Sequence, residues 1–201
     1  MREIRNGRCG WKIICPIREP VSRAISAFFE KYSPQSEAKR GPLGENLLYK
    51  KKYTEDTEEL FKEFSKNPNF YHGEQWFDDH IKKYFGIDVF AYDFNKDSGW
   101  GIIRDKRADI LIIQKEKLPL IGKDVIANFL NPSPNSLVLP QIRQTKNRHP
   151  KTLSILERKI AENYLEELKM VYGGKYAKHF YSQPDINKFI NKWVTIKYEK
   201  R

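Results

Sequence analysis

The strongest constraint on the fold is a short apolar run that leads directly into an amphipathic helix pattern. Residues 11–17 (WKIICPI) are bounded by Gly10 and by the segment Arg18-Glu19-Pro20, which predicts a buried strand. Pro20 suits the first turn of a helix. The apolar residues after it recur at helical spacing: Val21, Ala24, Ile25, Phe28 and Phe29. The sequence therefore predicts a strand over 11–17, a turn, and a helix over about 20–31.

The rest of the chain mixes helical and strand patterns. We expect further helices after Thr54, which can cap the first of them, and over 74–85, 121–130, 152–172 and 184–193. Turn residues separate three runs of strand formers, at 87–94, 99–104 and 108–114. Breakers mark 33–53 and 131–150 as loops. These patterns predict an α/β protein, and the length of 201 residues predicts a single domain over 1–201.

The charge balance indicates anionic partners. The chain carries 37 Lys and Arg against 26 Asp and Glu, a net charge of +11. Such a surface attracts phosphate, sulfate and carboxylate groups. Acidic residues such as Glu58 and Glu59 interrupt the positive charge, unlike a basic tail for DNA. We therefore favour an anionic nucleotide or polysaccharide over nucleic acid.

The cysteine count and the hydropathy pattern indicate a cytoplasmic location. Cys9 and Cys15 cannot build a disulfide framework, and no histidine pair lies near them at zinc-ligand spacing, so no metal is expected. No apolar run approaches the roughly 20 residues of a membrane span, and the first residues lack the apolar core of a signal peptide. We expect no transmembrane segment.

Two arginines and a hydroxyl follow the predicted strand. Arg18 stands where the strand ends, and free N–H groups at a helix start attract anions at that place in α/β sheets. Its guanidinium can make two parallel hydrogen bonds to a phosphate, and Ser26 can add a hydroxyl. Arg23 lies three residues before Ser26 and so on a neighbouring part of the helix surface. In the alternative interpretation Arg18 pairs with Glu19 or another carboxylate, Arg23 is solvated, and Ser26 is a small packing residue.

The spacing R-x-P-x-x-R-x-x-S from Arg18 to Ser26 resembles the 3′-phosphate-binding motif of sulfotransferases that use 3′-phosphoadenosine 5′-phosphosulfate. Residues 76–94, 108–118 and 177–193 (AKHFYSQPDINKFINKW) resemble a bacterial family of capsular polysaccharide synthesis proteins that is similar to sulfotransferases. The resemblance implies a sulfotransferase-like, P-loop-NTPase-like fold: a partial parallel sheet flanked by helices, with an inserted antiparallel β-meander. It also implies that Arg18 and Ser26 hold the 3′-phosphate.

The implied function is transfer of a sulfuryl group from this donor to a hydroxyl of a capsular polysaccharide or related glycan, without a metal. Sulfotransferases carry a phosphosulfate-binding loop with a lysine upstream of this motif, whereas only 17 residues precede Arg18 here. We therefore expect a chain truncated at its N-terminus relative to the family, and an enzyme if that loop is supplied or replaced. The alternative is a non-catalytic module that binds an anionic nucleotide, a glycan or a protein partner.

The basic loop 131–150 offers further candidate ligands. Arg143, Lys146 and Arg148 could close over a phosphate or an acidic sugar, or form an ordinary solvated loop. His72 is the best of the four histidines as a general base, because a neutral imidazole near pH 7 can accept a hydroxyl proton. An ordinary surface histidine is the alternative.

Aromatic residues could stack on adenine or on sugar rings. The candidates are Trp76, Phe77, Trp100 and Trp193. Helical spacing within this group favours a role in the hydrophobic core for most of them.

Overall fold

The computed structural model describes residues 10–31, 56–131 and 150–199. Its elements in chain order are β1 (Lys12–Ile17), α1 (Pro20–Lys31), α2 (Thr57–Ser65), α3 (His72–Trp76), the π-helix η2 (Phe77–Lys82), α4 (Lys83–Phe85), the 3₁₀-helix η3 (Val89–Ala91), β2 (Trp100–Arg104), β3 (Asp109–Gln114), α5 (Leu118–Leu130), α7 (Pro150–Gly173), α8 (Lys175–Phe180) and α9 (Gln183–Tyr198). The predicted α/β class is confirmed. None of the described helices is long and apolar enough to cross a membrane.

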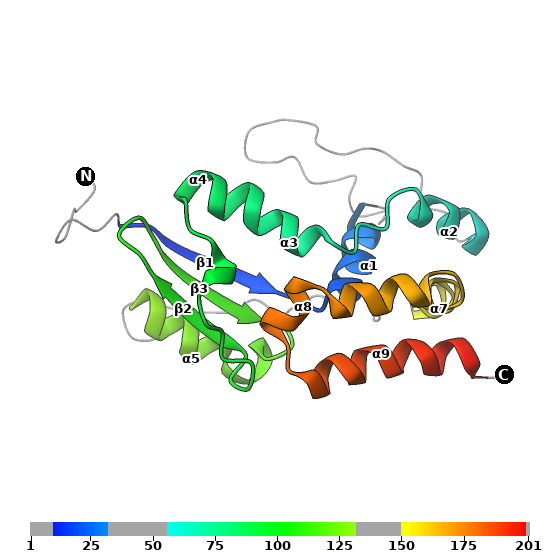
Figure 1. Ribbon diagram of the computed structural model, residues 1–201. Coiled ribbons are helices and arrows are strands. Elements are labelled where there is room, and N and C mark those ends of the chain that lie inside the picture. The colour runs from blue at the N-terminus through cyan, green and yellow to red at the C-terminus, as the bar shows by residue number, and fades with distance from the viewer. Residues whose placement is uncertain (1–9, 32–55, 132–149, 200–201) are drawn as a thin grey trace.

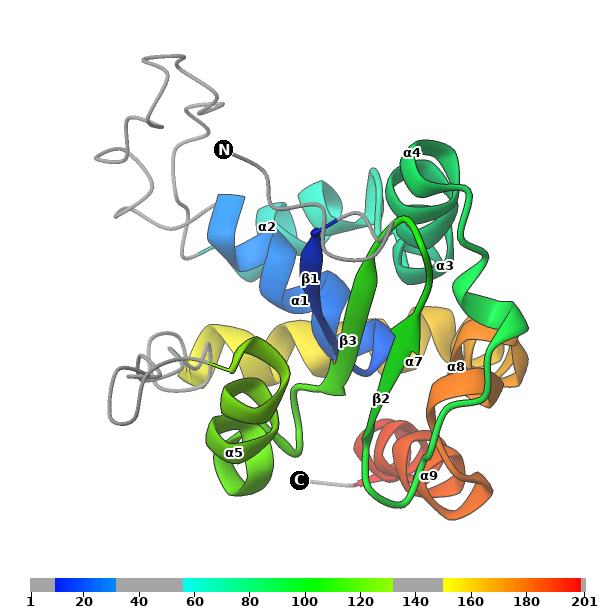
Figure 2. The ribbon, with the colours of Figure 1, turned by 90° about the vertical axis from the view of Figure 1, so that its left-hand side faces the viewer.

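The described strands form one mixed sheet in the order β1-β3-β2 (Figure 2). β1 and β3 run parallel with Ile17 opposite Gln114, and β2 runs antiparallel to β3. The Lys115 N–H donates to the Ile17 carbonyl over 2.7 Å, so the carboxyl ends of the two parallel strands lie together. Among the described strands β1 pairs with β3 alone. The backbone groups of Ile17 face β3. Those of the preceding residue, Pro16, face the other way, toward the edge of β1 that pairs with no described strand.

The predicted β-meander is wrong in its first strand. Residues 87–94 form η3 and irregular backbone, because the Asp88 carboxylate accepts the Phe90 N–H over 3.1 Å and closes a local turn. The rings of Phe90 and Phe94 pack on Phe180, with centroids 5.8 and 5.1 Å apart. β2 and β3 form a hairpin that is no insertion, since β3 is the central strand that also pairs with β1.

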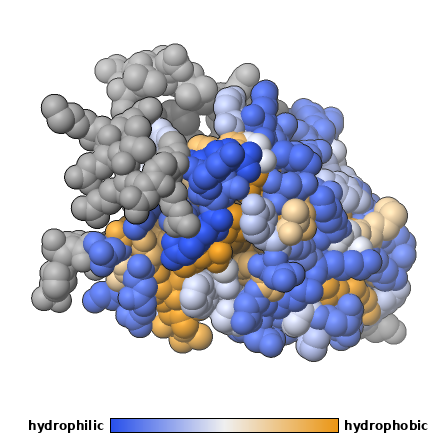
Figure 3. Space-filling model, turned by 60° about the vertical axis from the view of Figure 1, so that its left-hand side comes forward, coloured by the Kyte–Doolittle hydropathy of each residue, from blue (hydrophilic) through white to orange (hydrophobic). Residues whose placement is uncertain are grey.

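Two hydrophobic clusters cover the two faces of the sheet. Ile110 and Ile112 of β3 lie on one face and belong to the larger cluster, which also contains residues of α1, α7, α8 and α9. The opposite face carries Leu111 and Ile113, which pack against α5 (Figure 1). Figure 3 shows hydrophobic surface on the lower part of one side of the molecule, where Figure 2 places α5. Leu120 of α5 is 82% exposed. Among the described helices α5 covers this face, and beneath it Leu111 and Ile113 are fully buried.

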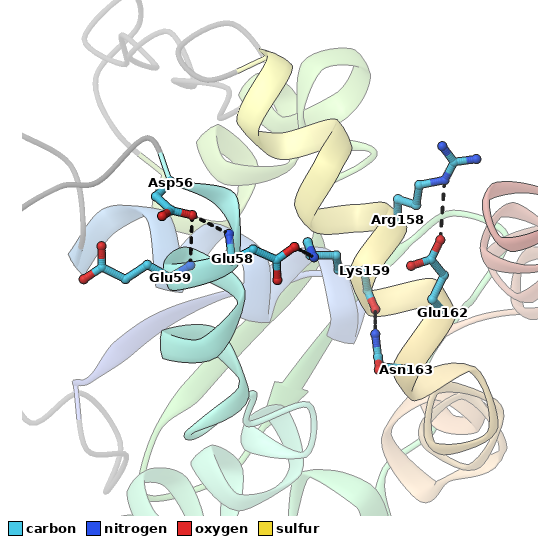
Figure 4. Close-up of polar contacts among 7 residues, drawn as sticks. All are labelled: Asp56, Glu58, Glu59, Arg158, Lys159, Glu162 and Asn163. Carbon is cyan, nitrogen blue, oxygen red and sulfur yellow. Dashed lines mark hydrogen bonds and ion pairs between the residues drawn. The ribbon is translucent and has the colours of Figure 1, made fainter. Parts of the chain in front are cut away.

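The N-terminal cap of α2 is Asp56 and not Thr54, which precedes the described residues. The Asp56 carboxylate accepts the N–H groups of Glu58 and Glu59 over 2.9 and 3.3 Å. Glu58 then forms an ion pair with Lys159 of α7 (Figure 4). Thr54 is too distant in sequence to accept these two N–H groups. The exposed ion pair between Glu58 and Lys159 adds at most about 1 kcal/mol to stability.

The predicted helices are present, with shifted ends. The prediction over 74–85 corresponds to α3, η2 and α4 in succession, and the predictions over 121–130, 152–172 and 184–193 correspond to α5, α7 and α9. Gly174 separates α7 from α8, which the sequence did not predict. Ser182 caps α9 by accepting the Asp185 N–H. These helices bring the C-terminal part of the chain against the carboxyl end of β1.

Candidate functional site

A cavity of about 360 Å³ lies along β1, between α1 and α3. Its walls come from the carboxyl half of β1, from one face each of α1 and α3, and from two single residues, Lys115 after β3 and Tyr176 of α8. This is the edge of the sheet at which ligands bind in open α/β folds. The cavity is therefore the candidate site.

The structure brings Arg18, Arg23 and Ser26 together in this cavity, where all three line the wall. The pattern of α1 explains why. The positions 21, 24, 25 and 28 are buried, whereas 23, 26, 27 and 30 line the cavity. Both sets have the i, i+3, i+4, i+7 spacing of one helix face. Burial of the apolar face of α1 therefore turns its polar face into the cavity wall.

Lys115 is a third cation at the cavity that the sequence reasoning missed. It follows β3 directly, and the parallel register places it beside Arg18, which follows β1. Burial lowers the pKa of Lys115, and the positive charge of Arg18 lowers it further. Burial also lowers the pKa of Arg23. Among the described residues the side chains of these three cations form no ion pair, and the lining acid is the exposed Glu30.

Glu19 does not neutralise Arg18. Its buried carboxylate accepts the N–H groups of Val21 and Ser22 over 2.9 and 2.8 Å, and it also accepts the Tyr172 hydroxyl. Glu19 thereby caps α1 from inside the protein. The alternative pairing of Arg18 with Glu19 is wrong. The expectation of free N–H groups at the helix start is wrong for the two that Glu19 accepts, so a ligand anion has to rely on side chains.

Two buried tyrosines fix the backbone at the end of β1. The Trp193 Nε1–H donates to the Tyr172 hydroxyl over 2.8 Å, and this hydroxyl donates to Glu19. The Tyr176 hydroxyl donates to the Arg18 carbonyl over 3.1 Å. Burial raises the pKa of both tyrosines, and the charge of Glu19 raises that of Tyr172 further. Both hydroxyls are therefore protonated donors that tie the C-terminal helices to the cavity.

Glu116 forms a second carboxylate contact at this corner. Its Oε1 accepts the Glu19 N–H over 3.0 Å, and its Oε2 accepts the Tyr181 hydroxyl over 3.4 Å. Although the residue as a whole is exposed, these contacts shield its carboxylate from water. The resulting desolvation raises the pKa of Glu116, and the nearby charge of Glu19 acts in the same direction.

The remaining predicted site residues are not brought into the cavity. His72 begins α3, and its Nδ1 lies 3.3 Å from the Asn69 Nδ2, but it is not among the lining residues. The loop residues Arg143, Lys146 and Arg148 lie outside the described part of the chain.

The aromatic candidates separate into two groups. Trp193 is 1% exposed within the main hydrophobic cluster, and Trp100 packs on the α5 face of the sheet. Trp76 and Phe77 line the cavity, but Phe77 is 3% exposed whereas Trp76 is half-buried. Trp76 is thus the aromatic candidate that combines a place in the wall with accessible ring surface.

Comparison with known proteins assigns the chain to a family. The family model described as "Putative capsular polysaccharide synthesis protein" matches residues 48–182, more than half of the 201 residues. The chain therefore belongs to this family, as its sequence patterns suggested. No curated protein and no solved structure matches it. The matched region contains Trp76, Lys115 and Tyr176, and it begins after Arg18 and Ser26.

Proposed function

We propose that the cavity binds the nucleotide donor 3′-phosphoadenosine 5′-phosphosulfate, and that the protein transfers its sulfuryl group to a hydroxyl of a capsular polysaccharide. The supporting observation is that Arg18, Arg23, Lys115 and Ser26 line one cavity. The side chains of Arg18, Arg23 and Lys115 form no ion pair with a described residue, and the charge of Arg18 lowers the pKa of Lys115. A bound anion relieves such repulsion between neighbouring cations. Membership of the capsular polysaccharide family supports the choice of acceptor.

Each of these residues has a role in the proposed complex. The Arg18 guanidinium and the Ser26 hydroxyl hold the 3′-phosphate, and Arg23 and Lys115 add positive charge. In the transfer step the acceptor oxygen forms a bond to sulfur while the bond from sulfur to the 5′-phosphate oxygen breaks. Adenosine 3′,5′-bisphosphate leaves, and the proton of the acceptor hydroxyl passes to water. Positioning and charge neutralisation supply most of the catalysis in such reactions.

Isothermal titration with adenosine 3′,5′-bisphosphate tests the binding half of the proposal. Arg18→Ala should weaken binding about 10- to 150-fold, the equivalent of one charged hydrogen-bonding group. Arg104→Ala is the matched control, because it removes the same charge from an exposed residue far from the cavity. Arg104 ends β2 and pairs with Asp109 at the start of β3, whereas the cavity lies at the other end of β3. Equal binding by both variants would rule out the assignment of Arg18.

A non-catalytic binding module is the second candidate function. It is favoured by the composition of the wall, since no histidine is among the described residues that line the cavity and the acid there is exposed Glu30. A transfer assay with labelled donor and capsular oligosaccharide separates the two functions. Turnover establishes the transferase, and nucleotide binding without turnover establishes the module.

A further inference from the structure

The wall of the cavity formed by α3 and the start of η2 carries two rings, of which that of Trp76 is half-buried and that of Phe77 is buried. Gly73, Trp76 and Phe77 line the cavity and share one helix face, at i, i+3 and i+4. A Cβ on Gly73 would lie 2.6 Å from a ring carbon of Tyr176, so the absence of a side chain lets α3 approach α8 closely. This close approach holds Trp76 at the cavity.

Two neighbouring rings contact the indole of Trp76. The His80 ring stacks on it with centroids 5.0 Å apart and an interplanar angle of 10°. Phe77 contacts it edge to face at 5.4 Å. The His80 Nδ1 lies 3.2 Å from the Trp76 carbonyl, which fixes the histidine ring in turn. His80 occupies one face of the indole and is not a lining residue of the cavity, so a ligand ring would stack on the opposite face. Side chains already ordered by such contacts lose less conformational freedom when a ligand binds.

The two walls together define the chemistry of the ligand. One wall offers the cations Arg18, Arg23 and Lys115, and the other offers the accessible indole of Trp76. An inorganic anion would use the first wall only. A volume of about 360 Å³ lies at the small end of ligand sites, enough for one nucleotide but small for a run of sugar units. A phosphate joined to a flat heteroaromatic ring satisfies both walls.

We infer that Trp76 is the base-binding residue of this cavity: the nucleobase stacks on its indole while the phosphate is held by the cationic wall. The inference rests on the proposed function, since it names the residue that distinguishes a nucleotide from other phosphate compounds at the same site. Base stacking on an aromatic side chain tolerates many bases, because every base has a π-face. Trp76 therefore selects for the presence of a base.

The test compares two ligands that differ only in the base. Adenosine 3′,5′-bisphosphate and its abasic analogue 1-deoxyribose 3,5-bisphosphate are titrated into the native protein and into Trp76→Leu. The variant should bind the nucleotide about 5- to 150-fold more weakly, the loss typical of removing one stacking ring, and the abasic analogue within about twofold of the native affinity. Trp76→Phe keeps a ring and should retain most of the nucleotide affinity.

Trp100→Leu is the matched control, because Trp100 is also half-buried but packs on the α5 face of the sheet. It should change neither affinity. If Trp76→Leu weakens both ligands equally, Trp76 only supports the fold, and the inference is overturned. It is also overturned, with the proposed function intact, if the native protein binds the abasic analogue as tightly as the nucleotide. A native protein that binds neither ligand overturns the inference and the proposed function together.

Discussion

Replacing Tyr172 with phenylalanine should destabilise the protein strongly while leaving its shape unchanged. The hydroxyl is fully buried, donates to the Glu19 carboxylate and accepts the Trp193 Nε1–H. Phenylalanine fills the same space without the oxygen. The substitution therefore removes both hydrogen bonds and opens little cavity.

The expected loss follows from the groups that stay behind. A hydrogen bond to a charged group contributes about 1.5–3 kcal/mol, and a buried donor without an acceptor costs about 1–3 kcal/mol. Glu19 keeps the N–H groups of Val21 and Ser22, which limits the first of these losses. We expect the free energy of unfolding to fall by about 2–4 kcal/mol in Tyr172→Phe.

Urea unfolding measures this change directly. With a slope of roughly 2–3 kcal/mol per molar for a chain of this size, the midpoint should fall by about 0.7–2 M with an unchanged slope. Tyr164→Phe is the matched control on the same helix, because the Tyr164 ring packs against Phe61 and Phe70 and its hydroxyl makes no hydrogen bond to a described residue. If the two variants lose the same stability, the link between Glu19 and the C-terminal helices does not stabilise the fold.

Two further substitutions test the surroundings of the cavity. Gly73→Ala should lower the free energy of unfolding by about 1–3 kcal/mol in thermal or urea unfolding, because the new Cβ would overlap the Tyr176 ring. In the control Gly173→Ala the new Cβ meets open space, and the change should be neutral or slightly stabilising. Equal effects of the two substitutions would contradict the close approach of α3 and α8. The pKa of Glu116 is raised in the folded state, so folding favours the protonated carboxyl. The stability that the protonated Glu116 contributes is full below about pH 4 and is lost as the pH rises through the folded pKa. Glu116→Gln should therefore gain stability relative to the native protein between pH 4 and pH 7, and a pH-independent difference in urea midpoints would contradict this.

Local patterns predicted the first strand, the first helix and three of the residues in the cavity. Proline at the start of α1 and helical spacing after it mark both elements, and that spacing places Arg23 and Ser26 on the face opposite to the core. Such features depend on residues close together in sequence. They could therefore be read without knowledge of the tertiary fold.

The missed features depend on contacts between distant parts of the chain. Lys115 reaches the cavity only because β3 pairs in parallel with β1, and Glu19 is satisfied by Tyr172, 153 residues away. Segment 87–94 has the residues of a strand, but its Phe90 and Phe94 pack on Phe180 of a distant helix, and tertiary packing of this kind overrides strand propensity. No local pattern encodes these partners.

Pro16 has a consequence for how the protein behaves at high concentration. It stands on the edge of β1 that pairs with no described strand, where a residue of any other type would offer a backbone donor to a strand from a neighbouring molecule. Pairing with a strand of a second chain is disfavoured next to the cavity, because Pro16 has no N–H to donate a hydrogen bond at that point. Among the described residues, the edge of β1 beside the cavity is therefore less suited to pairing with a strand of another molecule.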